Sequence, residues 1–374
     1  ISSDSWPIYI SLQKDGILFK MRRTQDLPDK ESATMFFQDC KLTHQAQITG
    51  ISHSIKEILP PDLLNLTQLQ KEANIRYGYT ASEVYDIAQA LYEKKLISYP
   101  RTSSRYLTED VFDSLSPIMA RLLSWELFPA AKGTGGIDIS SLSRHVISAE
   151  KANVHHAIII TGIRPGNLSE KEMQVYRLVA GRMLETFMAP CRIETTNVEA
   201  VCAAQHFKAE QTRIIEAGWH DVFMRSDMVP KSGYSVNELP EVEKSDTLNV
   251  CGCNMVHKKQ LPVNPFTDAE LVEYMEQNGL GTVSSRTNII RTLVNRKYIR
   301  YSGKYIVPTP KGMFTYETIR GKKIADTSLT ADWEKQLAGL ESGMITGQDF
   351  LNRIRTLAKE MTDDIFNTYS TKEE

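Results

Sequence analysis

The sequence predicts an α+β protein of several domains, in which one β domain is split by a mainly helical insertion. Three observations predict this class. Alternating apolar and polar residues, typical of strands, occupy the start of the chain and return after residue 190. Helix-capping patterns followed by apolar stripes fill the segment between them and begin the last third of the chain. A length of 374 residues allows two to four domains.

The strand-like segments predict one β domain. Residues 7–23 alternate around Lys14-Asp15-Gly16, which predicts a hairpin with an Asp-Gly turn. Alternation resumes from Cys191 onward. We therefore assign residues 1–56 and 190–258 to a single split β domain.

The insertion, residues 57–189, is predicted to be helical. Thr80 and Glu83 form a capping box in front of an apolar stripe. That helix leads into a short apolar strand that ends at Tyr99. A second helix begins at Ser169 and ends before Pro190.

The last third, residues 259–374, is predicted to be a winged helix-turn-helix domain. Thr267 opens another capping box, a glycine turn at 279–281 precedes a second helix, and residues 298–307 form a hairpin. Helix, turn, helix and hairpin is the order of elements in that DNA-binding motif.

A faint internal repeat links these two helical regions. Five residues before and at Tyr99 recur at identical spacing near Tyr301: Ile87, Leu91, Lys95, Ile97 and Tyr99 match Ile289, Leu293, Lys297, Ile299 and Tyr301. Any helix followed by a strand repeats its apolar spacing. Chance and a pair of winged-helix-like units therefore both remain open.

The net charge of −2 does not by itself indicate a nucleic-acid partner, but its distribution does. Between residues 286 and 323 there are ten Lys and Arg against one acid, Glu317. This basic block covers the second helix and hairpin of the winged-helix region. No apolar run is long enough to span a membrane.

The five cysteines predict neither disulfides nor a metal site. They are odd in number, and Cys251-Gly252-Cys253 has no second ligand pair of the kind that structural zinc requires. We interpret them as reduced thiols of a cytoplasmic protein and expect no metal in this chain.

The run Tyr99-Pro100-Arg101 is the most informative in the chain. A phenol has an ordinary pKa of about 10 and becomes a useful nucleophile where a fixed cation stabilises a phosphoryl transition state. Pro100 stiffens the turn between the hydroxyl and the guanidinium. The structural alternative is a strand end with a packed tyrosine and a surface arginine.

Tyr-Pro-Arg-Thr-x-Ser, from Tyr99 to Ser104, resembles the active-site motif of type IA DNA topoisomerases, especially the topoisomerase III branch. Three more segments resemble that family in the expected order: Val154 to Ile159, Gly279 to Thr282 with Arg286, and Leu329 to Glu334 with Gly343. Four motifs in order are far more specific than one, and they span nearly the whole chain.

The resemblance implies a catalytic set. Tyr99 would attack one DNA strand to give a 5′-phosphotyrosyl link and a free 3′-hydroxyl. Arg101 would contact the scissile phosphate, and His155 would hydrogen-bond near it, whereas His156 would be structural. The family commonly has an acid at the position of Ser103, so this chain departs from the pattern there.

The resemblance also implies a DNA-binding set. Arg105 is a candidate for contacting flanking backbone. Ser285 and Arg286, at the start of a helix, resemble a family position that holds the DNA backbone, because free amides at a helix N-terminus favour phosphate. A capping serine with a solvated arginine is the structural alternative.

The family uses Mg²⁺ bound by a toprim domain, whose acidic cluster is not found in this sequence. We therefore expect a fragment that lacks its N-terminal toprim domain, carries half of a shared active site and is inactive alone. The implied architecture is an arch, with the β domain bridging the two helical domains. The implied partners are single-stranded DNA, duplex DNA passing through the arch and the protein's own toprim domain, in the bacterial cytoplasm and at the nucleoid.

Other classes fit less well. A rolling-circle relaxase needs a His-hydrophobe-His metal motif, whereas His155 and His156 are adjacent. A tyrosine recombinase carries its tyrosine near the C-terminus. The non-enzymatic alternative is a winged-helix DNA-binding module in which Tyr99 is only structural.

Overall fold

The computed structural model describes residues 4–125, 127–129, 142–152, 155–223, 231–259, 264–341 and 343–370. The chain divides into two compact units. The first comprises Ile1–Pro61, Phe128–Asp138 and Leu184–Asn264. The second comprises Asp62–Leu127, Ile139–Met183 and Pro265–Glu374.

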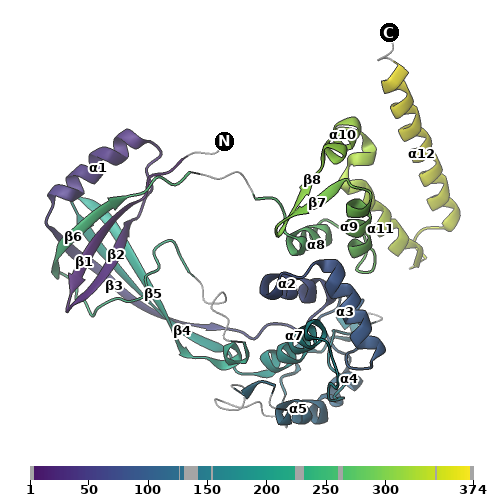
Figure 1. Ribbon diagram of the computed structural model, residues 1–374, viewed down its shortest axis with the longest axis horizontal. Coiled ribbons are helices and arrows are strands. Elements are labelled where there is room, and N and C mark those ends of the chain that lie inside the picture. Colours follow the sequence, from purple (N-terminus) through teal and green to yellow (C-terminus); the bar gives the residue numbers. More distant parts are fainter. Residues whose placement is uncertain are drawn as a thin grey trace. The chain divides into compact units, whose positions relative to one another are not determined.

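The first unit is built on a closed antiparallel barrel with the strand order β1-β2-β5-β4-β3-β6 (Figure 1). Strands from both β segments of the sequence therefore pair in one sheet. The strands are β1 (Ile8–Lys14), β2 (Ile17–Arg23), β3 (Gln45–Ile58), β4 (Cys191–Cys202), β5 (Gln205–Glu216) and β6 (Thr247–Met255).

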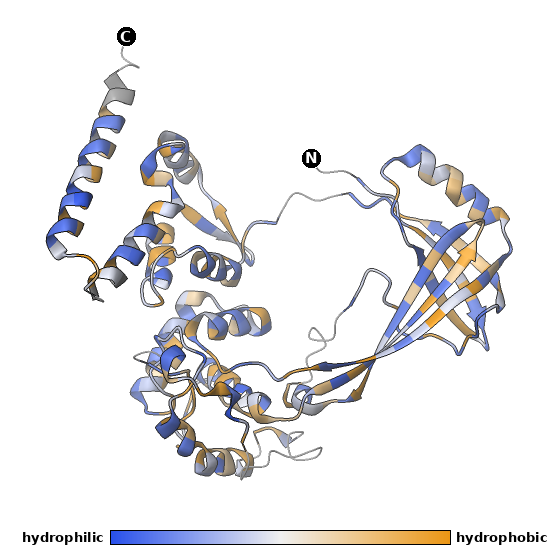
Figure 2. Ribbon diagram, turned by 180° about the vertical axis from the view of Figure 1, so that it is seen from behind, coloured by the Kyte–Doolittle hydropathy of each residue, from blue (hydrophilic) through white to orange (hydrophobic). Residues whose placement is uncertain are grey.

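Alternation along these strands creates the barrel core. Hydrophilic and hydrophobic residues alternate along much of their length (Figure 2), because successive side chains point to opposite faces. The predicted hairpin turn is confirmed: Asp15 and Gly16 both have positive φ, 52° and 81°, as an Asp-Gly hairpin turn requires. The inward residues form one cluster with these fully buried members: Ile8, Ile10, Leu12, Met21, Val198, Phe207 and Ala209.

Three features of this unit were not expected from the sequence. Helix α1 (Lys30–Leu42) is capped by Asp29, whose side chain accepts from the Ser32 amide at 2.7 Å, and it places Cys40 in the core. Strand β3 is long because it pairs with β4 over eleven residue positions, far beyond the buried part of the barrel. A short 3₁₀ helix, η4 (Gly218–Val222), follows β5.

The second unit is mainly helical. Its helices before residue 190 are α2 (Leu66–Tyr77), α3 (Ala81–Glu93), α4 (Glu109–Asp113), α5 (Leu115–Ser124), α6 (Ala149–Ala152) and α7 (Glu170–Phe187), whose last residues fall in the first unit. The elements after residue 264 are α8 (Asp268–Gln277), α9 (Arg286–Asn295), β7 (Ile299–Ser302), β8 (Tyr305–Pro308), α10 (Pro310–Ile319), α11 (Thr327–Glu341) and α12 (Gly347–Ser370).

The helix starts expected from the sequence are confirmed. Thr80 and Thr267 each form both hydrogen bonds of a capping box, with Glu83 and Glu270 respectively. Between α8 and α9, Gly279 and Gly281 have φ of 64° and 70°, in the left-handed region that favours glycine. The expected order of helix, glycine turn, helix and hairpin is therefore present.

The helix pair α2/α3 packs against the pair α8/α9 within this unit. Gln70 donates to the Thr287 hydroxyl at 2.9 Å, and Lys71 pairs with Glu273 at 2.8 Å. An apolar cluster lies among these polar contacts, made of Ala81, Val272, Met275, Ile290 and Ile306. The segments that the sequence assigned to two helical domains thus form one compact unit.

Among the described residues, no helix combines the length and the apolar character needed to cross a membrane.

Candidate active site

The segments around Tyr99 and His155 lie side by side. Ile97 and Ile160 form an antiparallel bridge, and the Ser98 amide donates to the Ile159 carbonyl at 2.8 Å. The segment before Tyr99 is thus held by a short bridge and not by a regular strand. As a result the Tyr99 and His155 rings meet, with their centroids 4.5 Å apart and their planes inclined by 47°.

The two residues differ in their exposure to solvent. His155 is exposed, whereas Tyr99 is partly buried and also meets the edge of the Tyr92 ring at 5.3 Å. The buried Thr102 hydroxyl donates to the His155 backbone carbonyl at 2.7 Å. The tyrosine loop therefore fixes the backbone of His155 and leaves its imidazole open to solvent.

Three small hydroxyl residues in this loop were not singled out from the sequence. Ser98 donates to the Ala157 carbonyl at 3.1 Å and accepts from the Ile159 amide at 3.0 Å. Ser104 donates to the Lys151 carbonyl at 2.7 Å. Together with Thr102, they tie the tyrosine loop to the histidine segment. The available signal was the presence of Ser and Thr residues on both sides of the Tyr-Pro-Arg run, since their hydroxyls readily bond to backbone groups.

Arg101 lies against α3. Its guanidinium sits 5.0 Å from the centre of the Tyr85 ring, and one of its terminal nitrogens donates to Gln89 at 3.3 Å. Its Nε is buried and has no acceptor among the described residues. A guanidinium offers five donors in a planar fork, so Arg101 keeps donor capacity that phosphate oxygens can use.

His156 has a structural contact. Its Nδ1 donates to the Ala157 carbonyl at 2.7 Å. Tyr106, the neighbouring tyrosine, packs under the Lys151 ammonium, which lies 4.9 Å from its ring centre. Val154, at the start of this motif, lies outside the described residues.

The DNA-binding candidates are not gathered at the Tyr99–His155 pair. Arg105 forms an ion pair with Asp62 at 3.3 Å, and its side chain is 46% exposed. Arg286 is only 8% exposed and donates to Glu276 at 3.4 Å and to the Leu280 carbonyl at 3.3 Å. Arg286 therefore stabilises the glycine turn between α8 and α9.

Ser285 is also engaged in the glycine turn. Its hydroxyl oxygen accepts from the Thr282 amide at 2.8 Å, and its own amide donates to the Thr282 carbonyl at 3.0 Å. Any phosphate contact by Ser285 would have to compete with these bonds.

The basic block is partly neutralised by acids. Arg291 pairs with Asp86 at 2.8 Å, and Lys323 pairs with Glu360 at 2.8 Å. Four other members are exposed at the end of α9 and on the hairpin: Arg296, Lys297, Arg300 and Lys304. These four are the best placed to meet a polyanion.

Comparisons with known proteins agree with the motif resemblance. The family model described as DNA topoisomerase matches residues 1–352. DNA topoisomerase 3 of Bacillus licheniformis is 31% identical over 344 residues, which cover 86% of this chain and 47% of that protein. DNA topoisomerase 3 of Bacillus subtilis strain 168 is 29% identical over 355 residues, covering 87% of this chain and 48% of that protein.

A solved structure has the same fold. Full-length topoisomerase I from Thermotoga maritima superposes with a TM-score of 0.72 at 22% identity, covering 95% of this chain and 58% of that one. The fold is thus that of a topoisomerase. From the family match, the chain belongs to the DNA topoisomerase family. It spans about half the length of the curated relatives it matches.

Proposed function

We propose that this chain carries the tyrosine-bearing part of a type IA topoisomerase active site, with Tyr99 as the nucleophile. The observation that supports the proposal most is the contact between the Tyr99 and His155 rings. The two residues are distant in sequence, and the motif resemblance assigns both to catalysis. A tyrosine with a purely structural role would not require an exposed imidazole beside it.

The proposed step exchanges one phosphodiester for another. The Tyr99 oxygen attacks a backbone phosphorus, the new O–P bond forms, and the bond from phosphorus to the 3′-oxygen breaks. The phenol loses its proton, and the leaving 3′-oxygen gains one. The phosphotyrosine ester keeps most of the free energy of the original bond, so the reverse step reseals the strand without ATP.

His155 and Arg101 would stabilise charge on the phosphate. The exposed imidazole of His155 can donate to a non-bridging oxygen while its backbone is held by Thr102. Arg101 is partly exposed and can donate through guanidinium N–H groups other than the one that Gln89 accepts. In each case the protein fixes the donor before the substrate arrives.

Mg²⁺ is proposed to bind outside this chain. Within the described ranges, no group of three or more His, Cys, Asp and Glu side chains could hold a metal ion. The relatives are about twice as long as this chain. We place the toprim domain and its metal carboxylates in that additional length.

The proposed substrate is single-stranded DNA in the bacterial cytoplasm. Duplex DNA is proposed to pass through the break in that strand. Arg296, Lys297, Arg300 and Lys304 supply exposed positive charge for the first contact. Changing DNA topology by relaxation or decatenation would follow from passing a strand through the break.

The test is to trap the covalent intermediate. The chain is incubated with a single-stranded oligonucleotide, with and without a separately supplied toprim domain, then denatured and analysed by mass spectrometry. We expect an adduct on Tyr99 only when the toprim domain is present. Relaxation of supercoiled DNA by the chain alone, or an adduct on another residue, would contradict the proposal.

A further inference from the structure

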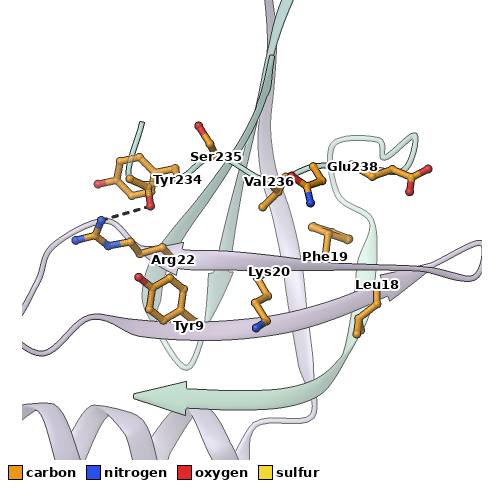
Figure 3. Close-up of a pocket in the computed structure, with 11 residues that line it drawn as sticks. Tyr9, Leu18, Phe19, Lys20, Arg22, Tyr234, Ser235, Val236 and Glu238 are labelled. Carbon is orange, nitrogen blue, oxygen red and sulfur yellow. Dashed lines mark hydrogen bonds between the residues drawn. The ribbon is translucent and has the colours of Figure 1, made fainter. Parts of the chain in front are cut away.

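The barrel unit contains a pocket of about 460 Å³ that the proposed chemistry does not use (Figure 3). Its walls come from β1, β2 and the segment 233–238. Pockets of roughly 300–1,000 Å³ are typical of small-molecule and cofactor sites. Its aromatic and charged lining residues are Tyr9, Phe19, Lys20, Arg22, Tyr234 and Glu238.

The pocket exists because two strands separate. Strands β2 and β5 pair only at Arg22 with Lys208 and at Arg23 with Phe207. Beyond that point the segment 233–238 runs beside β5. The Glu210 amide donates to the Tyr234 carbonyl at 2.9 Å, and the Val236 amide donates to the Glu210 carbonyl at 2.8 Å.

Two tyrosines from different segments are held at this opening. Tyr9 lies directly opposite Arg22 in the β1–β2 register, so their side chains share one face. Tyr234 is fixed by its hydroxyl, which donates to the Thr24 carbonyl at 2.9 Å. Both rings are partly buried, which limits their freedom and leaves some aromatic surface open.

Positive charge lies on the same side. Lys20 is exposed and lies two positions from Arg22 on β2, so it shares the face of Arg22 and Tyr9. The Arg22 guanidinium lies 5.5 Å from the Tyr234 ring centre and donates to the Gly233 carbonyl at 3.4 Å.

Arg22 is built into the wall of the pocket. It pairs with Asp26 at 2.5 Å, which neutralises its charge, but its Nε is buried and has no acceptor within the described part of the chain. A Cβ at Gly233 would lie 2.3 Å from the Arg22 guanidinium. A larger residue at this position would require the Arg22 guanidinium to move. Lys20, by contrast, is exposed.

We propose that this pocket binds one nucleotide of single-stranded DNA away from the break site. A base would stack on the open surface of Tyr9 or Tyr234, and the adjacent phosphate would meet the exposed ammonium of Lys20. Paired aromatic surface and positive charge are the features by which proteins hold single strands without sequence preference. The choice of DNA as the ligand rests on the proposed function. The pocket and the residues that line it are observed independently of that function.

Binding of a short single-stranded oligonucleotide to the full chain tests the proposal. Fluorescence anisotropy at low salt would compare the wild type with Tyr9→Leu, which removes the stacking surface, and Lys20→Glu, which reverses an exposed charge. Losing one stacked base should weaken the affinity about five-fold or more. Lys56→Glu, at an exposed position of β3 outside the pocket, is the matched control and should change the affinity much less.

Photocrosslinking gives a second readout that does not depend on the variants. With an oligonucleotide containing 5-iododeoxyuridine, we expect crosslinks at Tyr9 or Tyr234. Crosslinks confined to the helical unit, or unchanged affinity in both variants, would overturn the pocket proposal. An adduct on Tyr99 would still form in that case, so a failure here is distinguishable from a failure of the proposed active site.

Discussion

Tyr99 and Tyr301 end two segments with the same local backbone but lie in different surroundings. Each follows a helix that ends in a left-handed lysine: Lys95 has φ of 60° and Lys297 has φ of 62°. The amide that follows each lysine donates back to the last turn of the helix. The Leu96 amide donates to the Leu91 carbonyl at 3.0 Å, and the Tyr298 amide donates to the Leu293 carbonyl at 2.9 Å. The faint repeat in the sequence is therefore matched in the backbone.

The returning strands repeat as well. Ile97 bridges to Ile160 as Ile299 pairs with Pro308. The residue after each of these partners is a threonine whose hydroxyl donates to the carbonyl of the left-handed lysine. Thr161 donates to Lys95 at 2.7 Å, and Thr309 donates to Lys297 at 2.6 Å. In both segments the chain after the helix therefore pairs with a returning segment, through an isolated bridge in the first and a two-stranded sheet in the second.

The connection between the two strands is where the units differ. In the second unit a short turn at Gly303 joins β7 to β8. In the first, the chain leaves after Tyr99 and returns only at His155. This insertion places an imidazole beside Tyr99, whereas no such residue is available in a tight turn.

The two hydroxyls consequently differ. The Tyr301 hydroxyl donates to Asp268 at 3.2 Å, and burial together with that carboxylate raises its pKa. It is committed to a structural bond between elements of the helical unit. Under the proposed function, the shared unit presents a tyrosine, and the insertion supplies the histidine that would let Tyr99 react.

The strongest test exchanges each tyrosine for phenylalanine. Tyr99→Phe should abolish adduct formation in the presence of a toprim domain, because only the nucleophilic oxygen is removed, and DNA binding should stay nearly intact. Tyr301→Phe is the matched control and should still form the adduct. An adduct in Tyr99→Phe, detected by mass spectrometry, would show that the two units have been assigned the wrong roles.

The next test concerns the residue that the insertion supplies. His155→Ala should slow adduct formation by about 100-fold, the cost typical of losing one donor to a developing charge. His156→Ala should change the rate little, since its ring donates to the adjacent Ala157 carbonyl. Single-turnover kinetics measure both, and equal effects would remove the distinction between the two histidines.

The bond held by Tyr301 should matter for stability. The Asp268 side chain is almost fully buried and accepts from Tyr301 and from the Ala81 amide at the start of α3. Asp268→Ala leaves both donors without this acceptor and should lower the free energy of unfolding by about 1–3 kcal/mol. Urea denaturation measures this loss, and Tyr301→Phe should cost less because one donor is removed with its own bond.

The same carboxylate predicts a pH dependence. Burial raises the pKa of Asp268 above its ordinary value of 3.8. Between the two values the folded state binds more protons than the unfolded state, so the stability linked to this group falls as pH rises through the folded pKa. Asp268→Asn should remove that dependence. Parallel stability curves for the wild type and the variant as pH rises above 3.8 would contradict the assignment.

Much of this comparison could be predicted from the sequence, and its key contacts could not. The capping boxes and the Asp-Gly turn are local patterns that the structure confirms. The sequence left the meaning of the repeat open, and the structure shows matching backbone contacts in its two copies. The Tyr99–His155 contact was predictable only through family resemblance, because no local rule brings distant residues together. The burial of Arg286 was missed for the same reason, since its partner Glu276 lies on the preceding helix.

A smaller effect is expected for the exposed cations of the second unit. Replacing Arg296 and Arg300 by Ala should weaken binding to single strands and reduce the slope of log affinity against log salt by about 0.7 for each lost phosphate contact. Arg291→Ala is the control, since its side chain pairs with Asp86 and Ser82. An unchanged slope in the double variant would exclude this surface as the contact.

The smallest expected effect tests whether the two units share their backbone. Lys95 and Lys297 both adopt left-handed φ values, which cost a residue with a Cβ about 1 kcal/mol. Replacing either by glycine relieves that strain but adds freedom to the unfolded chain, so we expect a net gain of about 0.5 kcal/mol in each case. Thermal denaturation would compare the variants singly and together. Similar, additive gains would support equivalent positions, whereas a gain at one lysine and a loss at the other would break the equivalence on which the comparison rests.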